Sequence, residues 1–364
     1  MPGRLVVAKI GTSSLTDAGG RIQPGAIEKL CAEVAELRTA GEQVVVVSSG
    51  AIAAGLPVLG LGRPSDAAVL QAVSAVGQAH LVGHYNRALA AHGLVAGQVL
   101  LAPLDFVNRQ QYLHARQTLR VLLDLGVVPV INENDAIADD EIRFGDNDRL
   151  AALVSHLLRA DLLVMLTDTP GLLTGDPRLD SQASLIEEIV AVDHELEALA
   201  GGPGTARGSG GMASKLAAAK IAAWSGVRAV IAAADRSGVL RDSLDGKPGV
   251  GTVFVPRTER LPARKLWIAF AVAASGVIVV DAGARNALTS RSVSLLPAGV
   301  TGATGSFDVD DAVELAGPDG RVFAKGLTRY SARQVKELSG RRSADLPAEV
   351  PPEVVHRDDL VILP

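Results

Sequence analysis

The stretch Leu5–Ser14, LVVAKIGTSS, decides the fold class expected for the amino-terminal part of the chain. It opens with a short apolar run, which is typical of a buried strand in a parallel sheet. Lys9 lies near the end of this run, where an ammonium group costs free energy unless it meets an anion. The glycine and hydroxyl residues that follow leave backbone N–H groups able to face phosphate oxygens. The stretch therefore predicts a strand that ends at an anion site, although an edge strand whose lysine reaches water explains the same residues.

Five further runs of this kind follow along the chain, each short and nearly all apolar. They are Val44–Val47, Val95–Leu101, Val127–Ile131, Leu162–Leu166 and Val227–Ile231. Ala- and Leu-rich helical segments lie between the runs, namely Gly25–Thr39, Ala67–His92, Tyr112–Leu125, Asn147–Arg159 and Met212–Ser225. This alternation predicts a layered α/β fold with a mostly parallel central sheet. Ligands of such folds bind beyond the carboxyl ends of the strands.

The pattern changes near Pro256–Lys265, which we interpret as a linker. Beyond it, short strands with tight turns are predicted at Gly276–Asp281, Arg291–Leu296, Ala312–Leu315, Arg321–Ala324 and Leu360–Leu363. They indicate a small β-rich second domain of roughly a hundred residues. We expect the first domain over residues 1–258 and the linker with the second domain over 259–364, with a core near 270–350.

Composition and charge exclude several classes of protein. Of 364 residues, 48% are apolar and 21% are charged, so the chain is neither disordered nor fibrous, and its length favours two domains. A net charge of −5 argues against a dominant attraction of the whole chain to nucleic acid or to an anionic membrane. Cys31 is the single cysteine, which excludes an intramolecular disulfide and a cysteine zinc cluster. Lys9 interrupts the first apolar run and no run approaches the roughly 18 residues of a membrane span, so we expect a cytoplasmic protein without a signal peptide.

Two polar quartets, Asn132–Asp135 and Gly145–Asp148, form the densest polar cluster in the sequence. The first quartet ends a predicted strand and the second opens a predicted helix. Their carboxylates and carboxamides could hold an ammonium group, a magnesium ion or catalytic lysines. Turns and helix caps rich in Asn and Asp are the structural alternative. Because two such quartets frame one loop, we favour the functional interpretation.

A glycine-rich segment, Gly208–Lys215, precedes and opens an Ala-rich helix. Glycines let the backbone approach phosphates, the helix N-terminus adds positive potential, and Lys215 lies in the first turn. The segment is not a Walker A motif, and its match to G-x-G-x-x-A is weak because no strand immediately precedes it. We interpret it as a phosphate-binding loop, with a flexible capping loop as the alternative.

Three other features do not by themselves distinguish a functional from a structural role. Ser48–Ala51 follows a predicted strand and could cap a helix or bind an anion at its N-terminus. The loop Leu166–Arg178 could hold a nucleotide base and ribose or be an ordinary long loop. His80 and His84 are spaced as on one helix face, but no Glu lies between them as in a zinc protease motif, so we interpret them as a surface or packed pair.

The motifs, taken in this order, resemble those of the amino-acid kinase family. The matching segments are Val7–Ser13, Ser48–Gly55, Ile131–Asp135, Phe144–Asp148, Leu166–Asp168 with Gly171–Leu172, and Gly210–Met212 with Lys215. The carboxyl-terminal part resembles the PUA domain in Trp267–Ala269, Asp281–Ala284, Ser294–Val300 and His356–Leu360. The sequence departs from the family pattern at Ser209 and Ser214, where Thr is usual, and at Leu173, where Tyr is common.

The resemblance implies an αβα sandwich that transfers the γ-phosphoryl group of ATP to the side-chain carboxylate of L-glutamate. It assigns catalysis to Lys9, Lys215 and Asp148, with the lysines on either side of the moving group. The nucleotide-binding positions are Lys9, Gly11, Thr12, Ser13, Thr167, Asp168, Ser209, Gly210, Gly211, Met212, Ala213, Ser214 and Lys215, and the glutamate-binding positions are Ser49, Asn132, Asp135 and Asn147. Mg²⁺ is expected to bind through the ATP phosphates, so no protein metal ligand is assigned.

The resemblance also implies partners and regulation. We expect the first step of proline synthesis, inhibition by proline through the segment Pro103–Tyr112, a homo-oligomer, and functional coupling to a glutamyl-phosphate reductase. Two alternatives stay open. One is a related kinase that acts on aspartate, acetylglutamate or a phosphorylated nucleotide. The other is an RNA-binding or RNA-modifying PUA protein.

Basic residues of the second domain bear on the RNA alternative. Arg329, Arg333 and Lys336 are predicted to share one helix face, which could form an RNA patch. Residues 264–364 carry 12 basic and 12 acidic side chains, so the domain is neutral overall. We therefore favour a solvated helix face.

Overall fold

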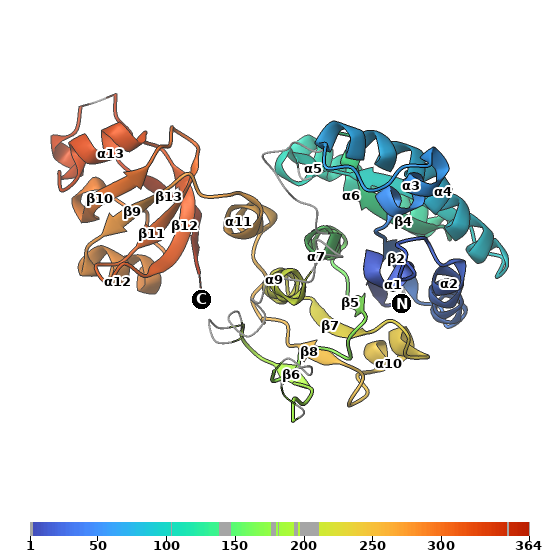
Figure 1. Cartoon of the computed structure of the whole chain (residues 1–364). Helices are drawn as coiled ribbons and strands as arrows, with labels where there is room; N and C mark the ends of the chain where they lie inside the picture. The colour runs from blue at the N-terminus through green and yellow to red at the C-terminus, as the bar shows by residue number, and fades with distance from the viewer. Residues whose placement is uncertain are drawn as a thin grey trace. The chain divides into compact units, whose positions relative to one another are not determined.

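The computed structural model describes residues 3–102, 104–137, 147–175, 180, 182–192, 196, 211–347 and 349–363. The chain forms two compact units, Met1–Arg260 and Leu261–Pro364 (Figure 1). Each unit contains its own sheet and its own hydrophobic core, so each is described by itself.

An eight-stranded sheet forms the centre of the first unit, in the order β3-β4-β2-β1-β5-β7-β8-β6. The strands are β1 (Leu5–Ile10), β2 (Gln43–Val47), β3 (Ala96–Leu101), β4 (Val128–Glu133), β5 (Leu162–Thr167), β6 (Glu188–Ile189), β7 (Arg228–Ala233) and β8 (Thr252–Phe254). Neighbouring strands are parallel except β7 and β8. Lys9 is paired with Val47 of β2 and with Met165 of β5, so β1 is a central strand. The alternative of an edge strand with a solvated lysine is therefore wrong.

Helices cover both faces of this sheet and complete the expected αβα sandwich. They are α1 (Thr12–Leu15), α2 (Pro24–Thr39), α3 (Ala51–Leu59), α4 (Ala67–Ala90), α5 (Leu104–Val107), α6 (Arg109–Asp124), α7 (Asn147–Leu158), α9 (Met212–Trp224), α10 (Val239–Asp245) and the 3₁₀ turn η1 (Asp135–Ile137). Figure 1 shows α2 and α10 on one side of the strands and α7 and α9 on the other. The six strands and five long helices predicted for this part of the sequence are confirmed, with ends that shift by a few residues.

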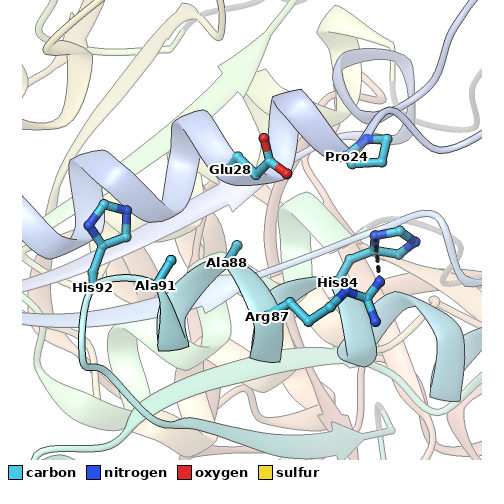
Figure 2. A pocket seen from close by; sticks show the side chains of 7 residues that line it. All are labelled: Pro24, Glu28, His84, Arg87, Ala88, Ala91 and His92. Atoms are coloured by element: carbon cyan, nitrogen blue, oxygen red, sulfur yellow. Dashed lines mark hydrogen bonds between the residues drawn. The ribbon is translucent and has the colours of Figure 1, made fainter.

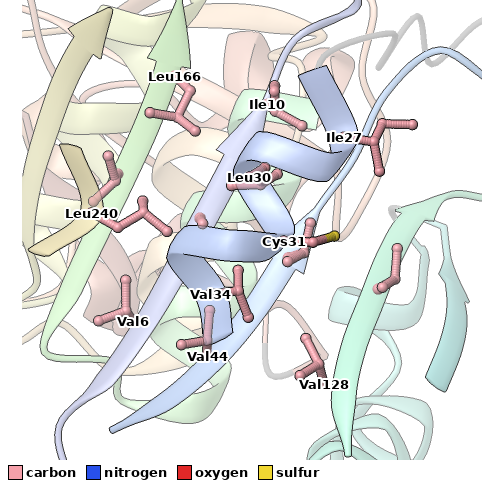
Figure 3. Close-up of a cluster of buried hydrophobic side chains, with 14 of the residues drawn as sticks. Val6, Ile10, Ile27, Leu30, Cys31, Val34, Val44, Val128, Leu166 and Leu240 are labelled. Carbon is pink, nitrogen blue, oxygen red and sulfur yellow. The ribbon is translucent and has the colours of Figure 1, made fainter. Parts of the chain in front are cut away.

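The main core lies between the sheet and the layer that contains α2 (Figure 3). Side chains of α2, among them Cys31, pack on Val6 and Ile10 of β1. Cys31 is fully buried, and burial raises the pKa of its thiol to about 12, so it behaves as a small apolar residue. Successive side chains of a strand point to opposite faces. Lys9 therefore points away from this core, toward the layer of α7 and α9.

Helices α3 and α4 approach each other so closely that glycine is required at the contact. A Cβ atom on Gly77 would lie 1.8 Å from the Ala51 carbonyl oxygen, and one on Gly55 would lie 2.1 Å from the Val73 carbonyl oxygen. Both atoms belong to backbone, which cannot move aside as the end of a side chain can. The contact fixes α4 beside the first turns of α3, where the chain leaves the end of β2.

Two alanine substitutions in α4 test this contact. Gly77→Ala is expected to lower the free energy of unfolding by about 1–3 kcal/mol, because the added methyl group forces the helices apart. Gly83→Ala is the matched control, since its Cβ would lie 3.6 Å from the nearest atom, the flexible end of Arg87. That change should be neutral or should stabilise the helix by up to about 1 kcal/mol. Urea unfolding of both variants measures the difference, and equal effects would contradict the close packing.

The second unit contains a five-stranded sheet in the order β10-β9-β11-β12-β13. Its strands are β9 (Gly276–Val280), β10 (Val300–Gly305), β11 (Ala312–Ala316), β12 (Val322–Thr328) and β13 (Val355–Ile362). The remaining elements are α11 (Ala263–Leu266), η2 (Trp267–Ala271), α12 (Ala282–Arg291), η3 (Pro297–Gly299), α13 (Ala332–Leu338) and η4 (Ser343–Asp345). The β-rich character of this part is confirmed. No helix among the described residues of either unit is both long and apolar enough to cross a membrane.

Two predictions for the second unit are wrong. The expected strand Arg291–Leu296 is absent, since α12 runs to Arg291 and Leu295 forms only an isolated antiparallel bridge with Val355. The Asp281 side chain caps this helix by accepting a hydrogen bond of 2.7 Å from the backbone N–H of Ala284. Arg329 precedes α13, so it does not share a helix face with Arg333 and is ion-paired with Glu353 at 3.3 Å. Arg333 is paired with its helix neighbour Glu337 at 2.7 Å.

Candidate active site

Three charged side chains from three distant segments meet on one side of the central sheet. The Lys9 ammonium lies 2.5 Å from Oδ1 of Asp148, and the Lys215 ammonium lies 3.2 Å from Oδ2 of the same carboxylate. Lys9 belongs to β1, Asp148 to the first turn of α7 and Lys215 to the first turn of α9. Exposed fractions of 3%, 0% and 5% make these three residues a buried charge cluster.

The three side chains of this cluster carry two positive charges and one negative charge. Burial alone would raise the pKa of Asp148, but the charges of Lys9 and Lys215 outweigh it and bring that pKa to about 2. Ser214 adds a hydrogen bond of 2.9 Å from its hydroxyl to Oδ2. Asp148 is therefore a carboxylate at neutral pH, and two ammonium groups share it. A buried excess of positive charge is stabilised by a bound anion.

Several positions expected to bind nucleotide belong to the same elements as this cluster or to a neighbouring strand. A Cβ on Gly11 would lie 3.5 Å from the Lys9 ammonium nitrogen, so the backbone of Gly11 passes beside that charge, and Thr12 and Ser13 follow in α1. Gly211 precedes α9 without a side-chain cap, and Met212 and Ala213 open that helix. At the end of β5 the Thr167 hydroxyl donates to Oδ1 of Asp168 at 3.1 Å. Ser209 and Gly210 lie outside the described residues.

The positions expected to bind the acceptor form a second, hydrogen-bonded group. Nδ2 of Asn147 donates to Oγ of Ser49 at 3.2 Å, which joins the start of α7 to the end of β2. The backbone N–H of Glu133 donates to Oδ1 of Asn147 at 3.2 Å and to Oδ1 of Asn132 at 3.0 Å. The structure thus brings Ser49, Asn132 and Asn147 together at the carboxyl ends of β2 and β4.

Helix α4 supplies two site residues that the sequence analysis did not single out. The Ser74 hydroxyl donates to Oδ2 of Asp135 at 2.6 Å, and Oε1 of Gln78 accepts from Nδ2 of Asn132 at 2.9 Å. Four residues separate the two in α4, so they share one face of that helix, next to the contact that Gly77 makes with α3. Polar residues four apart in a helix with a buried apolar face were the signal that could have found them.

Neighbouring residues of α7 connect the two groups. Asn147 belongs to the acceptor group and Asp148 to the charge cluster, so a single turn of helix places both. The other half of this quartet, Gly145 and Asp146, lies outside the described residues. An acceptor held at Asn147 would therefore lie next to an anion held by the two lysines.

A cavity of about 520 Å³ between α2 and α4 contains none of these side chains (Figure 2). It is lined by Pro24, Glu28, His84, Arg87, Ala88, Ala91 and His92. Arg87 is hydrogen-bonded to Nδ1 of His84 at 3.1 Å, and burial followed by the Arg87 charge lowers the His84 pKa, so His84 is neutral near pH 7. The cavity thus belongs to the opposite end of α4 from Ser74 and is separate from the candidate site.

The side chains of the charge cluster suit the binding of a nucleoside triphosphate better than direct ligation of a metal ion. Both oxygens of Asp148 are engaged by lysines, and no group of three or more His, Cys, Asp or Glu that could hold a metal occurs among the described residues. Divalent magnesium binds oxygen ligands and keeps several waters or phosphate oxygens. The described residues are thus compatible with Mg²⁺ that binds through the phosphates of a nucleotide.

Comparison with known proteins agrees with this arrangement. Residues 4–233 match the amino acid kinase family and residues 276–350 match the PUA domain. The chain belongs to the amino acid kinase family, and it is an enzyme that transfers a phosphoryl group.

The most similar curated relatives share one name. Glutamate 5-kinase of Geobacter sp. (strain M21) is 46% identical over 363 residues, which cover 98% of this chain and 97% of that protein. Glutamate 5-kinase of Frankia casuarinae is 49% identical over 368 residues, with 99% and 97% coverage. A solved carbamate kinase from Giardia lamblia bound to AMP-PNP superposes with a TM-score of 0.50 at 21% identity, over 70% of this chain and 99% of that one. This last likeness concerns the fold alone.

Proposed function

We propose that the protein transfers the γ-phosphoryl group of ATP to the side-chain carboxylate of L-glutamate and so forms glutamyl 5-phosphate. The observation that carries the proposal is the pair of lysine ammonium groups on opposite oxygens of Asp148, with Asn147 of the acceptor group next to it in α7. The name shared by relatives at 46–49% identity selects glutamate among carboxylate acceptors.

The geometry suits a reaction between two anions. A carboxylate acceptor is ionised at neutral pH, so it needs no general base. The difficulty lies in bringing it to a polyphosphate and stabilising charge spread over the moving phosphoryl oxygens. Lys9 and Lys215 would contact those oxygens from two sides, while Asp148 holds both lysines in place. The backbone N–H groups of Gly11–Ser13 and of the segment Gly208–Met212 would complete the cradle.

The acceptor group would orient glutamate by its α-amino-acid end. In this proposal Asp135 binds the α-ammonium group, and Ser49, Asn132 and Asn147 bind the remaining polar atoms. Thr167 and Asp168, at the end of β5, belong to the nucleotide side.

Asp135→Ala should raise the KM for glutamate by about 10–100-fold and leave kcat within about threefold. The expected loss is that of one charge-assisted hydrogen bond, about 1.5–3 kcal/mol. Steady-state kinetics with glutamate and ATP varied in turn measures it, and an unchanged KM for ATP is the internal control. Normal saturation by glutamate would remove this carboxylate from the acceptor site.

Trapping of the acyl phosphate tests the proposed function directly. The full-length protein is incubated with ATP, Mg²⁺ and hydroxylamine, and hydroxamate formation is compared for glutamate, aspartate and acetylglutamate. We expect product with glutamate in clear excess over the other two. Product with aspartate or acetylglutamate alone would instead establish a related kinase.

Regulation and partners are proposed on the same basis. The reaction would begin proline synthesis in the cytoplasm, in a homo-oligomer coupled to a glutamyl-phosphate reductase. Proline would compete with glutamate because both present an α-amino-acid end, with α5 and the start of α6 responding; Pro103 of this segment lies outside the described residues. Proline-insensitive activity of the purified enzyme would contradict that regulation.

RNA binding by the second unit stays a prediction with its own test. Arg329 and Arg333 are already paired with Glu353 and Glu337, which favours the interpretation of a solvated surface. RNA binding that weakens steeply with salt, in a protein without phosphoryl transfer, would support the alternative.

A further inference from the structure

Ser74 uses its hydroxyl differently from Ser155 and Ser225, two other buried serines of this unit. In α7 the Ser155 hydroxyl donates to the carbonyl oxygen of Ala151, one turn back, at 2.7 Å. At the end of α9, Ser225 does the same with Ile221 at 2.8 Å. The Ser74 hydroxyl donates its only proton to Oδ2 of Asp135, 61 residues away in sequence, at 2.6 Å. Its partner is therefore a side chain of the acceptor group, not its own helix.

The surroundings make this hydrogen bond a rigid one. Ser74 is 3% exposed, and it lies one turn before Gly77, where the backbones of α4 and α3 touch. Gln78, four residues later, holds Asn132 from the same face. Asp135 itself begins the short 3₁₀ turn η1, an element of three residues. The packed helix α4 thus orients the carboxylate of Asp135, which belongs to a short turn.

We propose that Ser74 is a positioning residue that makes the enzyme select acceptors with an α-ammonium group, by holding Asp135 in the orientation that binds it. The inference rests on the proposed function and deepens it. Ser74 is hydrogen-bonded to Asp135, whereas both lysines are paired with Asp148, so we expect its effect on acceptor binding alone.

The charge state of Asp135 depends on the same contact. Burial raises the pKa of Asp135 above its ordinary value, and the hydrogen bond from Ser74 opposes that rise. Removing the hydroxyl should therefore move the Asp135 pKa further upward, so that the acid limb of kcat/KM for glutamate shifts to higher pH. If Ser74 had only a packing role, its removal would leave the pH at which kcat/KM for glutamate falls on the acid side unchanged.

The test compares Ser74→Ala with wild type and with Ser155→Ala, which removes an equally buried helical hydroxyl that bonds within its own helix. Two ligands are used: glutamate as substrate, and glutarate, which lacks the amino group, as a competitive inhibitor. Ser74→Ala should raise the KM for glutamate by about 5–20-fold, less than Asp135→Ala does, because the carboxylate remains and only the hydrogen bond that orients it is lost. It should leave kcat and the glutarate inhibition constant within about twofold of their wild-type values. Ser155→Ala should leave the KM for glutamate, kcat and the glutarate inhibition constant within the same range.

Ser74→Cys provides a second variant of similar size whose S–H group is a weak donor. It should fall between wild type and Ser74→Ala in KM for glutamate. An equal rise in the glutamate KM and the glutarate inhibition constant, or no rise in either, would overturn the role assigned to Ser74. If hydroxamate trapping shows that aspartate is the acceptor, the proposed function fails; the same variants are then compared with aspartate and succinate, and that pair decides the role of Ser74.

Discussion

Lys215→Ala is expected to lower kcat by at least about 100-fold, while the KM values for ATP and glutamate change much less. The reason is that charge spreads over the phosphoryl oxygens in the transition state, where a fixed ammonium group stabilises it most. The wild-type lysine is already held in position by Asp148 at 3.2 Å, so little reorganisation is needed during the reaction. Removing it also leaves Asp148 with a single lysine partner.

Steady-state kinetics and a folding measurement together decide this prediction. Lys220→Ala is the matched control, because Lys220 lies in the same helix α9 but outside the charge cluster. The kcat of the Lys220→Ala control should stay within about threefold of the wild-type value. A Lys215→Ala enzyme that is folded and turns over at the wild-type rate would exclude Lys215 from catalysis.

Asp148→Asn is expected to have the second large effect, on stability as well as on activity. It removes the negative charge that two buried ammonium groups share, and breaking a buried ion pair in this way costs about 3–5 kcal/mol. The lysines would move apart, so kcat should also fall by roughly 100-fold or more. Urea unfolding and acyl-phosphate trapping measure the two losses.

The free energy of unfolding should also depend on ATP in the Asp148→Asn variant and on pH in the wild type. ATP should restore part of the lost stability, because its phosphates replace the missing negative charge.

In wild type the ion pair stabilises the fold fully above the ordinary Asp pKa of about 3.9, and this contribution is lost as pH falls through about 2. The control Asp124→Asn changes an exposed carboxylate at the end of α6 and should shift stability by less than about 0.5 kcal/mol. Equal stability of the two variants would contradict the buried cluster.

The sandwich could be predicted from sequence because its strands and helices differ in hydrophobic period. Runs such as Val44–Val47 are too short and too apolar for surface helices, and the segments between them repeat apolar residues with a helical period. Local patterns mark Lys9, Asp148 and Lys215 only as charged residues at strand ends or helix starts. The expectation that they converge came from the family resemblance, because strand order is not contained in local patterns.

The parts that could not be predicted depend on tertiary contacts. Ser74 and Gln78 gain their partners because Gly55 and Gly77 allow α3 and α4 to touch. In the second unit, Ala282–Arg291 has a weak apolar pattern, and its helix depends on the cap by Asp281. Antiparallel pairing of β7 with β8 likewise follows from chain reversal around α10 and not from either strand's residues.

The adjacency of Asn147 and Asp148 has a consequence for redesign of this enzyme. One peptide unit joins Asn147, which is proposed to bind the acceptor, to the carboxylate that holds both lysines, so a backbone change made to admit a larger acceptor would also displace the two ammonium groups. If the proposed function holds, new acceptor preferences are more readily engineered from α4 and the end of β4, which belong to the acceptor group and lie outside the charge cluster.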